Sequence, residues 1–198
     1  MRLPANQRRR QLLDVAGPVF AARGFAATTM DDVATAAGVT KPVLYQHFPS
    51  KRALFAEMLD DMGDQLLTEL ATATSRAETG RERVELGFAA YFRFVAAHRT
   101  SFQVLFGAAA RNDAEFSEIV VRVLDDVATA VGALIDIDAP DEQRRVLAHA
   151  LIGIAEATSR SLLVHPDTDI EAHALARWTS ELAWFGLRGV RAYNTSRS

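Results

Sequence analysis

Apolar residues recur at helical spacing along nearly the whole chain. In residues 6–23 one face of a helix collects Leu12, Leu13, Ala16, Val19 and Phe20. Glu118–Val121 has the composition of a strand but lies inside a longer helical pattern. Glycine, proline and polar clusters separate the periodic segments. The pattern predicts an all-α fold of about nine helices.

A tight pair of short helices is predicted between residues 29 and 48. Thr29 and Asp32 have the spacing of a capping box, and Thr28 with Asp31 offers the same pattern one residue earlier. Gly38 suits the left-handed residue that ends a helix. A second helix then begins at about residue 40 and closes near residue 48.

The second of these helices has two dissimilar faces. A small core is expected from Val33, Ala37, Val39, Leu44 and Phe48. The outward or rim positions are Thr40, Lys41, Pro42, Val43, Tyr45 and His47. An exposed tyrosine, lysine and histidine on so short a helix are unusual for packing alone and suit a helix that meets phosphates and base edges.

These residues carry a resemblance to a known family. The stretch from Arg9 to Leu54 resembles the DNA-binding head of the TetR family of repressors. The matching residues are Ala16, Phe20, Gly24-Phe25, Thr28-Thr29, Ala34, Gly38-Val39-Thr40, Leu44-Tyr45, His47-Phe48, Ser50-Lys51 and Leu54-Phe55. The resemblance implies an N-terminal three-helix DNA-binding domain over residues 1–52 and a larger helical ligand-binding and dimerisation domain over residues 53–198.

The resemblance also implies roles for individual residues. Thr29 and the start of its helix would hold a phosphate, Tyr45 and His47 would contact the DNA backbone, and Lys51 would make a further phosphate contact. Alternatives stay open, since Tyr45 also suits half-buried packing and His47 also suits an ordinary surface position.

Base edges are assigned to the start of the second helix. Thr40, Lys41 and Val43 are the candidates, with Pro42 beside them on the rim. At 42 and 43 the family often has smaller or hydroxylated residues, and because Val43 cannot donate a hydrogen bond, the operator sequence is not predictable. The arginines at 8–10 are either contacts to an adjacent groove or a solvated tail.

Charge separates the head from the rest of the chain. Eight basic and three acidic residues give residues 1–52 a formal charge of +5, so the remainder carries −8 within the net −3. A basic N-terminal region on an otherwise acidic chain indicates that one surface binds a polyanion such as a nucleic acid. The chain has no cysteine, no apolar run long enough to span a membrane and no signal-peptide pattern, which favours a cytoplasmic protein.

Aromatic residues gather in the middle of the chain. An ordinary hydrophobic core explains most of them, and the alternative is a cavity for an apolar ligand. The candidate ligand-binding residues are Phe88, Tyr91, Phe92, Phe102, Phe106, Leu124 and Trp178.

Small residues form a stripe on the helix predicted for residues 141–164. They let another helix approach closely, and the final helix offers large apolar partners. The candidate dimer interface is Ala150, Gly153 and Ala157 with Leu182 and Phe185. Trp178 and Trp184 fit core, interface or pocket equally well.

Catalysis is not expected. There is no thiol, no HExxH pattern, no glycine-rich phosphate loop and no nucleophile elbow. His165 and His173, with Asp167 and Asp169, form a metal-binding alternative to a polar loop, and the polar loop is preferred. No metal and no cofactor are predicted.

The sequence thus predicts a homodimeric repressor, released from a palindromic operator by a small, mostly apolar effector of unknown identity, with no membrane partner. Three alternatives remain: a ligand-independent regulator, an activator, and a ligand-binding module without DNA function.

Overall fold

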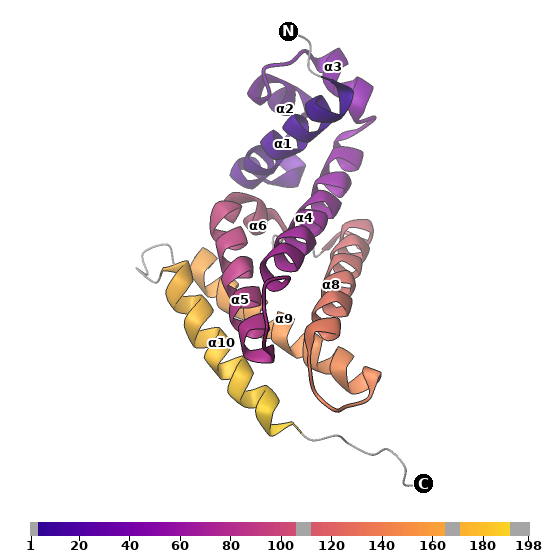
Figure 1. The fold of residues 1–198 in the computed structure, drawn as a ribbon. Helices are drawn as coiled ribbons and strands as arrows, with labels where there is room; N and C mark the ends of the chain where they lie inside the picture. Colours follow the sequence, from indigo (N-terminus) through magenta and orange to yellow (C-terminus); the bar gives the residue numbers. More distant parts are fainter. Residues whose placement is uncertain (1–3, 106–111, 165–170, 191–198) are drawn as a thin grey trace. The chain divides into compact units, whose positions relative to one another are not determined.

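The computed structural model describes residues 4–105, 112–164 and 171–190 and confirms an all-α fold (Figure 1). These ranges contain nine helices and no strand. The helices are α1 (Ala5–Ala27), α2 (Met30–Ala36), α3 (Lys41–His47), α4 (Lys51–Thr74), α5 (Gly80–Ala97), α6 (Arg99–Leu105), α8 (Ala114–Leu134), α9 (Asp141–Val164) and α10 (Ala172–Gly189). Phe106, His165, Asp167 and Asp169 lie outside the described residues.

The chain folds into two compact units. Unit 1 comprises Met1–Asp64 and His98–Arg122, and unit 2 comprises Gln65–Ala97 and Val123–Ser198. The helices α4 and α8 each contribute to both units. The functional division into residues 1–52 and 53–198 concerns DNA binding rather than compactness and stays a prediction.

Glycine interrupts the first helix of unit 1 where the sequence predicts its end. The helix α1 extends to Ala27, but Gly24 within it has φ +75° and ψ 160°. L-residues with side chains rarely adopt that φ, whereas glycine does so without a steric penalty. The last turn of α1 is therefore redirected, and it carries Phe25 toward the core of unit 1.

The core of unit 1 is built around four phenylalanine rings. Phe55 of α4 lies at the centre, with ring centroids 5.0 Å from Phe20, 4.9 Å from Phe25 and 4.6 Å from Phe116. Phe20, Phe55 and Phe116 are fully buried. Aromatic pairs at these distances add to the gain from burial, so the start of α8 is part of the structure that supports the helix-turn-helix.

The helix-turn-helix forms by the local rules that its sequence predicts. Thr29, rather than Thr28, caps α2: its side chain accepts from the Asp32 amide, and the Asp32 carboxylate accepts from the Thr29 amide. Gly38 has φ +64° and makes the turn toward α3. Leu44 and Phe48 are fully buried beneath α3, so one face of α3 is anchored and the other is left outside.

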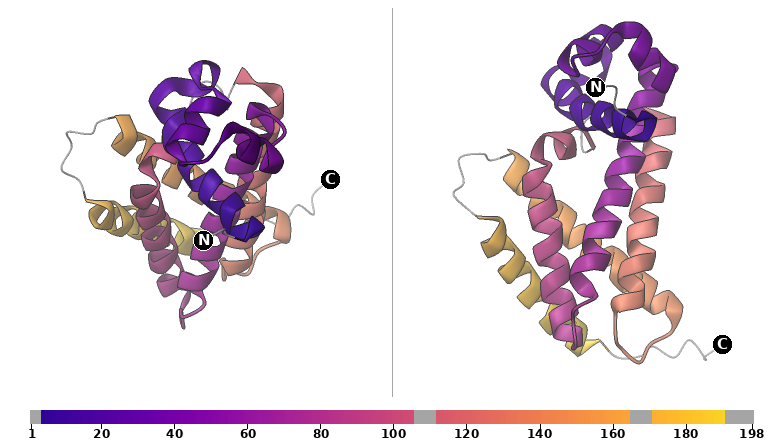
Figure 2. Two further views of the ribbon diagram at one scale, coloured as in Figure 1. Left: turned by 90° about the horizontal axis from the view of Figure 1, so that it is seen from above. Right: turned by 45° about the horizontal axis from the view of Figure 1, so that its top comes forward.

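Unit 2 is a helical layer structure in which α5 lies alongside α10 (Figures 1 and 2). Phe88 and Phe92 of α5 pack against Ala155 of α9 and Ala183 of α10. A second cluster joins α8, α9 and α10 through buried Ala128, Ala148 and Leu187. Among the described helices none is both long enough and apolar enough to cross a membrane.

Candidate nucleic-acid interface

The outer face of α3 is exposed and polar. Thr40, Lys41 and Pro42 at its start are exposed, and the Tyr45 side chain one turn later is 43% exposed. Val43 and His47 are half-buried beside them. The buried face of α3 fixes the orientation of these side chains, which is what a rigid recognition surface needs.

Carboxylates in the first turn of α2 are paired with cations from neighbouring elements. Lys41 Nζ lies 3.0 Å from a carboxylate oxygen of Asp31, and Arg23 of α1 pairs with Asp32. The hydrogen bond that Lys41 donates to Asp31 raises the pKa of Lys41 above its ordinary value. Lys41 therefore stays charged. To contact a phosphate or a base edge of DNA, it would first have to leave its ion pair with Asp31.

The capping box of α2 fixes the position of Thr29. Besides its amide bonds, the Thr29 hydroxyl donates to Asp32 Oδ2 at 2.7 Å. The hydrogen bonds from the Thr29 side chain and backbone, aided by Arg23, hold the pKa of Asp32 below its usual range.

Replacing Thr29 with alanine should lower the free energy of unfolding by about 1 kcal/mol, the usual loss for an N-cap side chain. Thr29→Ser keeps the hydroxyl and should stay close to the parent. Urea denaturation followed by helical circular dichroism measures the difference. Equal stability of the alanine and serine variants would contradict a capping role.

Acid should remove the contribution of Asp32. Its pKa is lower in the folded than in the unfolded protein, so its stabilising effect is fully present above the unfolded pKa and is lost as the pH falls through the folded pKa. The stability difference between the parent and Asp32→Asn should therefore shrink from neutral pH into acid. If the stability difference between the parent and Asp32→Asn grows in acid instead, the pKa of Asp32 is raised by folding and not lowered.

Lys51 faces the end of α1. Its Nζ donates to the backbone carbonyls of Phe25 at 2.7 Å, Ala26 at 3.1 Å and Thr28 at 2.7 Å. A phosphate role for Lys51 therefore has to compete with three hydrogen bonds that already exist in the free protein.

The arginines near the start of α1 also have partners within unit 1. Arg9 pairs with Glu57, and its guanidinium carbon lies 4.4 Å from the ring centroid of Phe48. Arg10 pairs with Asp61. These contacts tie α1 to α4 and to the end of α3, a role that the sequence pattern of three arginines did not reveal.

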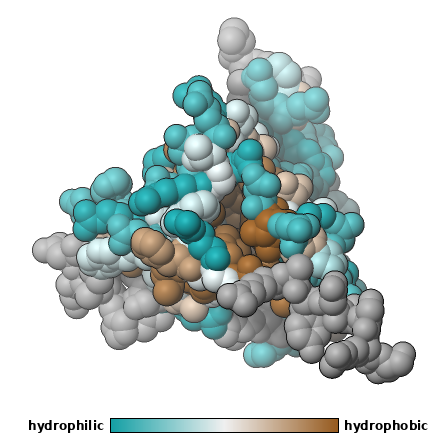
Figure 3. All heavy atoms as spheres, turned by 60° about the horizontal axis from the view of Figure 1, so that its bottom comes forward, coloured by the Kyte–Doolittle hydropathy of each residue, from teal (hydrophilic) through white to brown (hydrophobic). Residues whose placement is uncertain are grey.

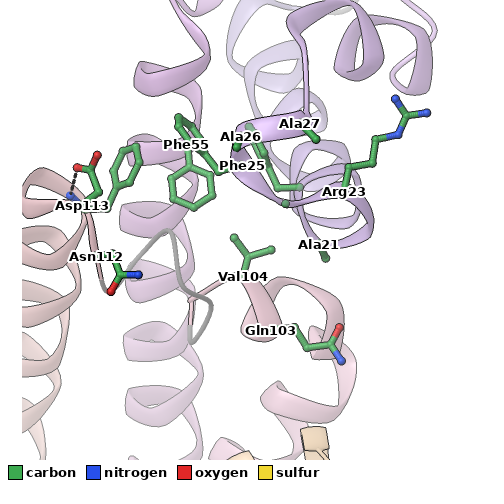
Figure 4. Close-up of a pocket in the computed structure, with 13 residues that line it drawn as sticks. Ala21, Arg23, Phe25, Ala26, Ala27, Phe55, Gln103, Val104, Asn112 and Asp113 are labelled. Atoms are coloured by element: carbon green, nitrogen blue, oxygen red, sulfur yellow. Dashed lines mark hydrogen bonds between the residues drawn. The ribbon is translucent and has the colours of Figure 1, made fainter.

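A hollow of about 660 Å³ lies within unit 1 (Figure 4). The aromatic cluster contributes Phe25 and Phe55 to its lining, and α6 contributes Gln103 and Val104. None of the expected ligand-binding residues that the structure describes lines it. Its exposed residues are mainly small or polar.

The expected ligand-binding residues are divided between the two units. Phe88 and Tyr91 both pack against Phe92 in unit 2, whereas Phe102 is buried in unit 1. Leu124 is half-buried on α8, and the Trp178 side chain is 50% exposed on α10. The structure thus brings three of the seven together, and the ligand-binding roles stay predictions.

Tyr91 places a polar group within the aromatic part of unit 2. Its hydroxyl accepts a hydrogen bond from Ser159 Oγ at 3.2 Å. Burial raises the pKa of Tyr91 to about 12, so the phenol is neutral at ordinary pH. On the face of unit 2 that Figure 3 turns forward, apolar side chains gather in a central hollow with polar ones around it.

The expected interface residues form two exposed stripes. On α9 the expected residues Ala150, Gly153 and Ala157 are all exposed, and Val146, which was not among the expected residues, extends the same stripe. On α10 the expected residues Leu182 and Phe185 are 64% and 65% exposed, and the exposed Trp178 extends their stripe. Both stripes repeat at steps of four and three residues, which places each on one face of its helix.

Two residues of the candidate DNA surface escaped the sequence reasoning. Gln46 is exposed next to Tyr45 on α3, and its amide is able both to donate to and to accept from a base edge. Asp31 orients Lys41. The helical spacing of Gln46 places it on the outer face of α3, so the sequence could have indicated it. The ion pair between Asp31 and Lys41 joins two different helices, and no sequence pattern indicates it.

Comparison with known proteins decides the family. Residues 12–58 match the family described as bacterial regulatory proteins, tetR family, and residues 80–186 match the Tetracyclin repressor-like C-terminal domain. This chain belongs to the TetR family.

Relatives of this TetR-family protein include regulators of transcription. The HTH-type transcriptional activator FasR of Mycolicibacterium smegmatis is 32% identical over 96% of this chain and 87% of its own length. A crystal structure of a TetR-like transcriptional regulator from Rhodococcus sp. RHA1 matches with a TM-score of 0.75 at 32% identity, over 96% of this chain and 100% of that one.

A more distant match concerns the fold alone. The transcriptional regulator FadR from Bacillus subtilis, solved in complex with stearoyl-CoA, has a TM-score of 0.76 at 17% identity, over 92% of this chain and 99% of that one. The head and body of the TetR-family fold are thus both present here.

Proposed function

We propose that this TetR-family regulator is a homodimer that binds a palindromic operator and is released from it by a small, mostly apolar effector. The exposed outer face of α3, held from beneath by buried Leu44 and Phe48, carries the proposal. Thr40, Lys41 and Val43 meet base edges, with Pro42 on the rim. Thr29, Tyr45 and His47 contact the DNA backbone.

Two heads are needed because one short helix reads few base pairs. In a two-fold dimer the two copies of α3 enter successive major grooves about 34–36 Å apart. The exposed stripes on α9 and α10 support this assembly, because apolar patches on a soluble surface commonly mark an interaction site. Small residues on α9 let a partner helix approach closely, and four helices complete the interface.

The effector is proposed to bind in unit 2. Phe88 and Phe92 supply apolar surface, and the neutral Tyr91 hydroxyl supplies one polar contact. Largely apolar sites with a few polar groups are typical of small-molecule binding. The complex of FadR with stearoyl-CoA supports an effector with a long apolar portion, since a protein of the same fold accommodates one.

Repression is the proposed sign of regulation, because a dimer that occupies an operator within a promoter excludes polymerase without further contacts. Activation is the second candidate. It is favoured by the similarity to FasR, which is described as a transcriptional activator and aligns with 96% of this chain. Mapping the operator relative to the transcription start separates the two.

A fluorescence-anisotropy titration tests DNA binding directly. The protein is titrated against the intergenic DNA upstream of its own gene, at two salt concentrations and with scrambled competitor. Tight binding that survives competitor and weakens with salt supports a sequence-specific regulator. Equally weak binding to both DNAs would count against this operator.

Tyr45→Phe should weaken binding at least about tenfold on every sequence, because a hydrogen bond to a charged group contributes about 1.5–3 kcal/mol. The variant removes only the hydroxyl, so α3 should keep its fold. Val43→Ala is the matched control, since its loss should depend on the sequence at one operator position. Unchanged affinity of Tyr45→Phe would remove Tyr45 from the backbone contacts.

A further inference from the structure

One acidic side chain lies among the residues proposed to meet DNA. Asp31 is in the first turn of α2, its side chain is 61% exposed, and one carboxylate oxygen lies 3.0 Å from Lys41 Nζ at the start of α3. The adjacent Asp32 closes the capping box with Thr29 and pairs with Arg23. Because Asp32 already supplies both the cap and a negative charge at the start of α2, the helix does not require Asp31.

Lys41 and Tyr45 place Asp31 on the same surface as the proposed recognition residues. The hydrogen bond that Lys41 donates to Asp31 is the main cause of the raised pKa of Lys41, and Tyr45 also contributes electrostatically. All three side chains are exposed. DNA that meets Lys41 and Tyr45 would therefore also meet the carboxylate of Asp31.

The compact unit that carries this surface has little net positive charge. Unit 1 contains 11 basic and 10 acidic residues, so its formal charge is +1, although residues 1–52 alone carry +5. Acids of α4 and α8 pair with Arg9, Arg10 and Arg52. General attraction to phosphates depends on positive charge, so a carboxylate on this surface lowers the affinity for DNA unless it finds a donor there.

A C·G base pair offers partners for both members of the ion pair. In the major groove cytosine presents its N4 amino donor, which carboxylates bind, and guanine presents the O6 and N7 acceptors, which lysines bind. The same amino group donates to guanine O6 within the base pair, so the two atoms lie about 2.9 Å apart. The Asp31 oxygen and Lys41 Nζ are 3.0 Å apart, a spacing that lets both engage one base pair while they remain in contact.

We propose that Asp31 is a specificity-determining residue that reads one C·G pair in each half-site together with Lys41. Asp31 accepts from cytosine N4, and Lys41 donates to guanine O6 and N7. An A·T pair fits less well, because it sets adenine N7 beside the carboxylate and a thymine methyl group beside the ammonium. This role rests on the proposed function, since the ion pair has to face a major groove.

Selection from a pool of randomised duplexes, followed by sequencing of the bound fraction, tests the role without a known operator. The parent is compared with Asp31→Ala, Asp31→Asn and Lys41→Met. Asp14→Ala is the matched control, since it removes another exposed carboxylate of unit 1, whose arginine partner lies on the same helix. Each protein is used at a temperature where it is fully folded.

The parent should select C·G over the other base pairs at one position of each half-site by about tenfold or more. Asp31→Ala and Lys41→Met should both lose the preference at that same position and keep it elsewhere. Asp31→Asn should select A in place of C, because an amide matches the N6 and N7 groups of adenine. Asp14→Ala should select the parent sequence.

A motif that is unchanged in Asp31→Ala would overturn the proposal. So would a loss in Asp31→Ala and in Lys41→Met at two different positions, because the two residues would then not read one pair. A merely structural role of Asp31 predicts a third result, namely weaker binding with equal base preferences at every position, and this result also overturns the proposal.

Affinity for a duplex of mixed sequence provides an independent readout. Asp31→Ala should bind such a duplex about threefold more tightly, because a negative charge near the phosphates is gone, and bind the selected parent motif about tenfold more weakly. The ratio of the two affinities should therefore fall about thirtyfold, whereas Asp14→Ala should change it by less than about twofold. A ratio that Asp31→Ala leaves unchanged would contradict a role in specificity.

Failure of the proposed function has a different signature. A parent protein that enriches no sequence refutes the regulator proposal and this role with it. A parent that enriches a palindromic motif insensitive to Asp31 refutes this role alone. If Asp31→Ala does not fold, Asp31→Asn has the same shape and decides through the change from C to A.

Discussion

Replacing Leu182 and Phe185 together with glutamate should produce folded monomers that bind an operator about 10²–10⁴-fold more weakly. Both side chains are largely exposed on a single chain, so their removal leaves the cores of unit 2 intact. In the proposed dimer, four new carboxylates would meet across the two-fold axis. The loss in affinity follows because two linked heads gain from a high effective concentration and a single head does not.

Sedimentation velocity measures the assembly, and anisotropy measures DNA binding. Val121→Glu is the control, since it places a single new carboxylate on an apolar residue that is exposed but lies on α8. Gly153→Leu probes the α9 stripe, because a Cβ at that glycine meets no atom within 4 Å in the single chain. Dimers that persist in both the glutamate variant and Gly153→Leu would move the interface to another surface.

Replacing Phe116 with alanine should destabilise the DNA-binding head even though the residue lies far beyond it in the sequence. Phe116 is fully buried, with its ring 4.6 Å from Phe55 and 5.1 Å from Phe25. Truncating a buried phenylalanine costs about 3–5 kcal/mol, a large part of the 5–15 kcal/mol that is typical of a domain. We expect early loss of exchange protection in α1 and the first half of α4.

Val121→Ala on the same helix is the control and should change the unfolding free energy by less than about 0.5 kcal/mol, since that side chain is exposed. Denaturant unfolding followed by hydrogen exchange with peptide resolution distinguishes the head from the rest of the chain. If Phe116→Ala loses protection only within α8, the head does not depend on this ring.

The features that the sequence predicts here are those governed by neighbouring residues. The Thr29–Asp32 capping box and the left-handed Gly38 each depend on a few positions, and both are found as expected. Of the small core, Val33 and Leu44 are fully buried. Helical periodicity alone determines which side of α3 is anchored.

The features that it does not predict depend on residues far apart in the chain. Phe116 packs on Phe55 across 61 positions, and Lys51 reaches Phe25 across 26. Periodicity marks such residues as buried or exposed but carries no information on their partners. For the same reason the aromatic stripe of α5 indicates burial of Phe88 without distinguishing a core from an effector site.

The position of the tryptophans has a spectroscopic consequence. The two tryptophans of the chain, Trp178 and Trp184, both lie on α10. Trp184 is half-buried beneath the Arg188 guanidinium, whereas half of the Trp178 side chain is exposed on the α10 stripe. Intrinsic tryptophan emission therefore reports on a single helix. It should shift to the blue when Trp178 leaves water on self-association, and it should be insensitive to melting of the helix-turn-helix, which needs a fluorophore of its own.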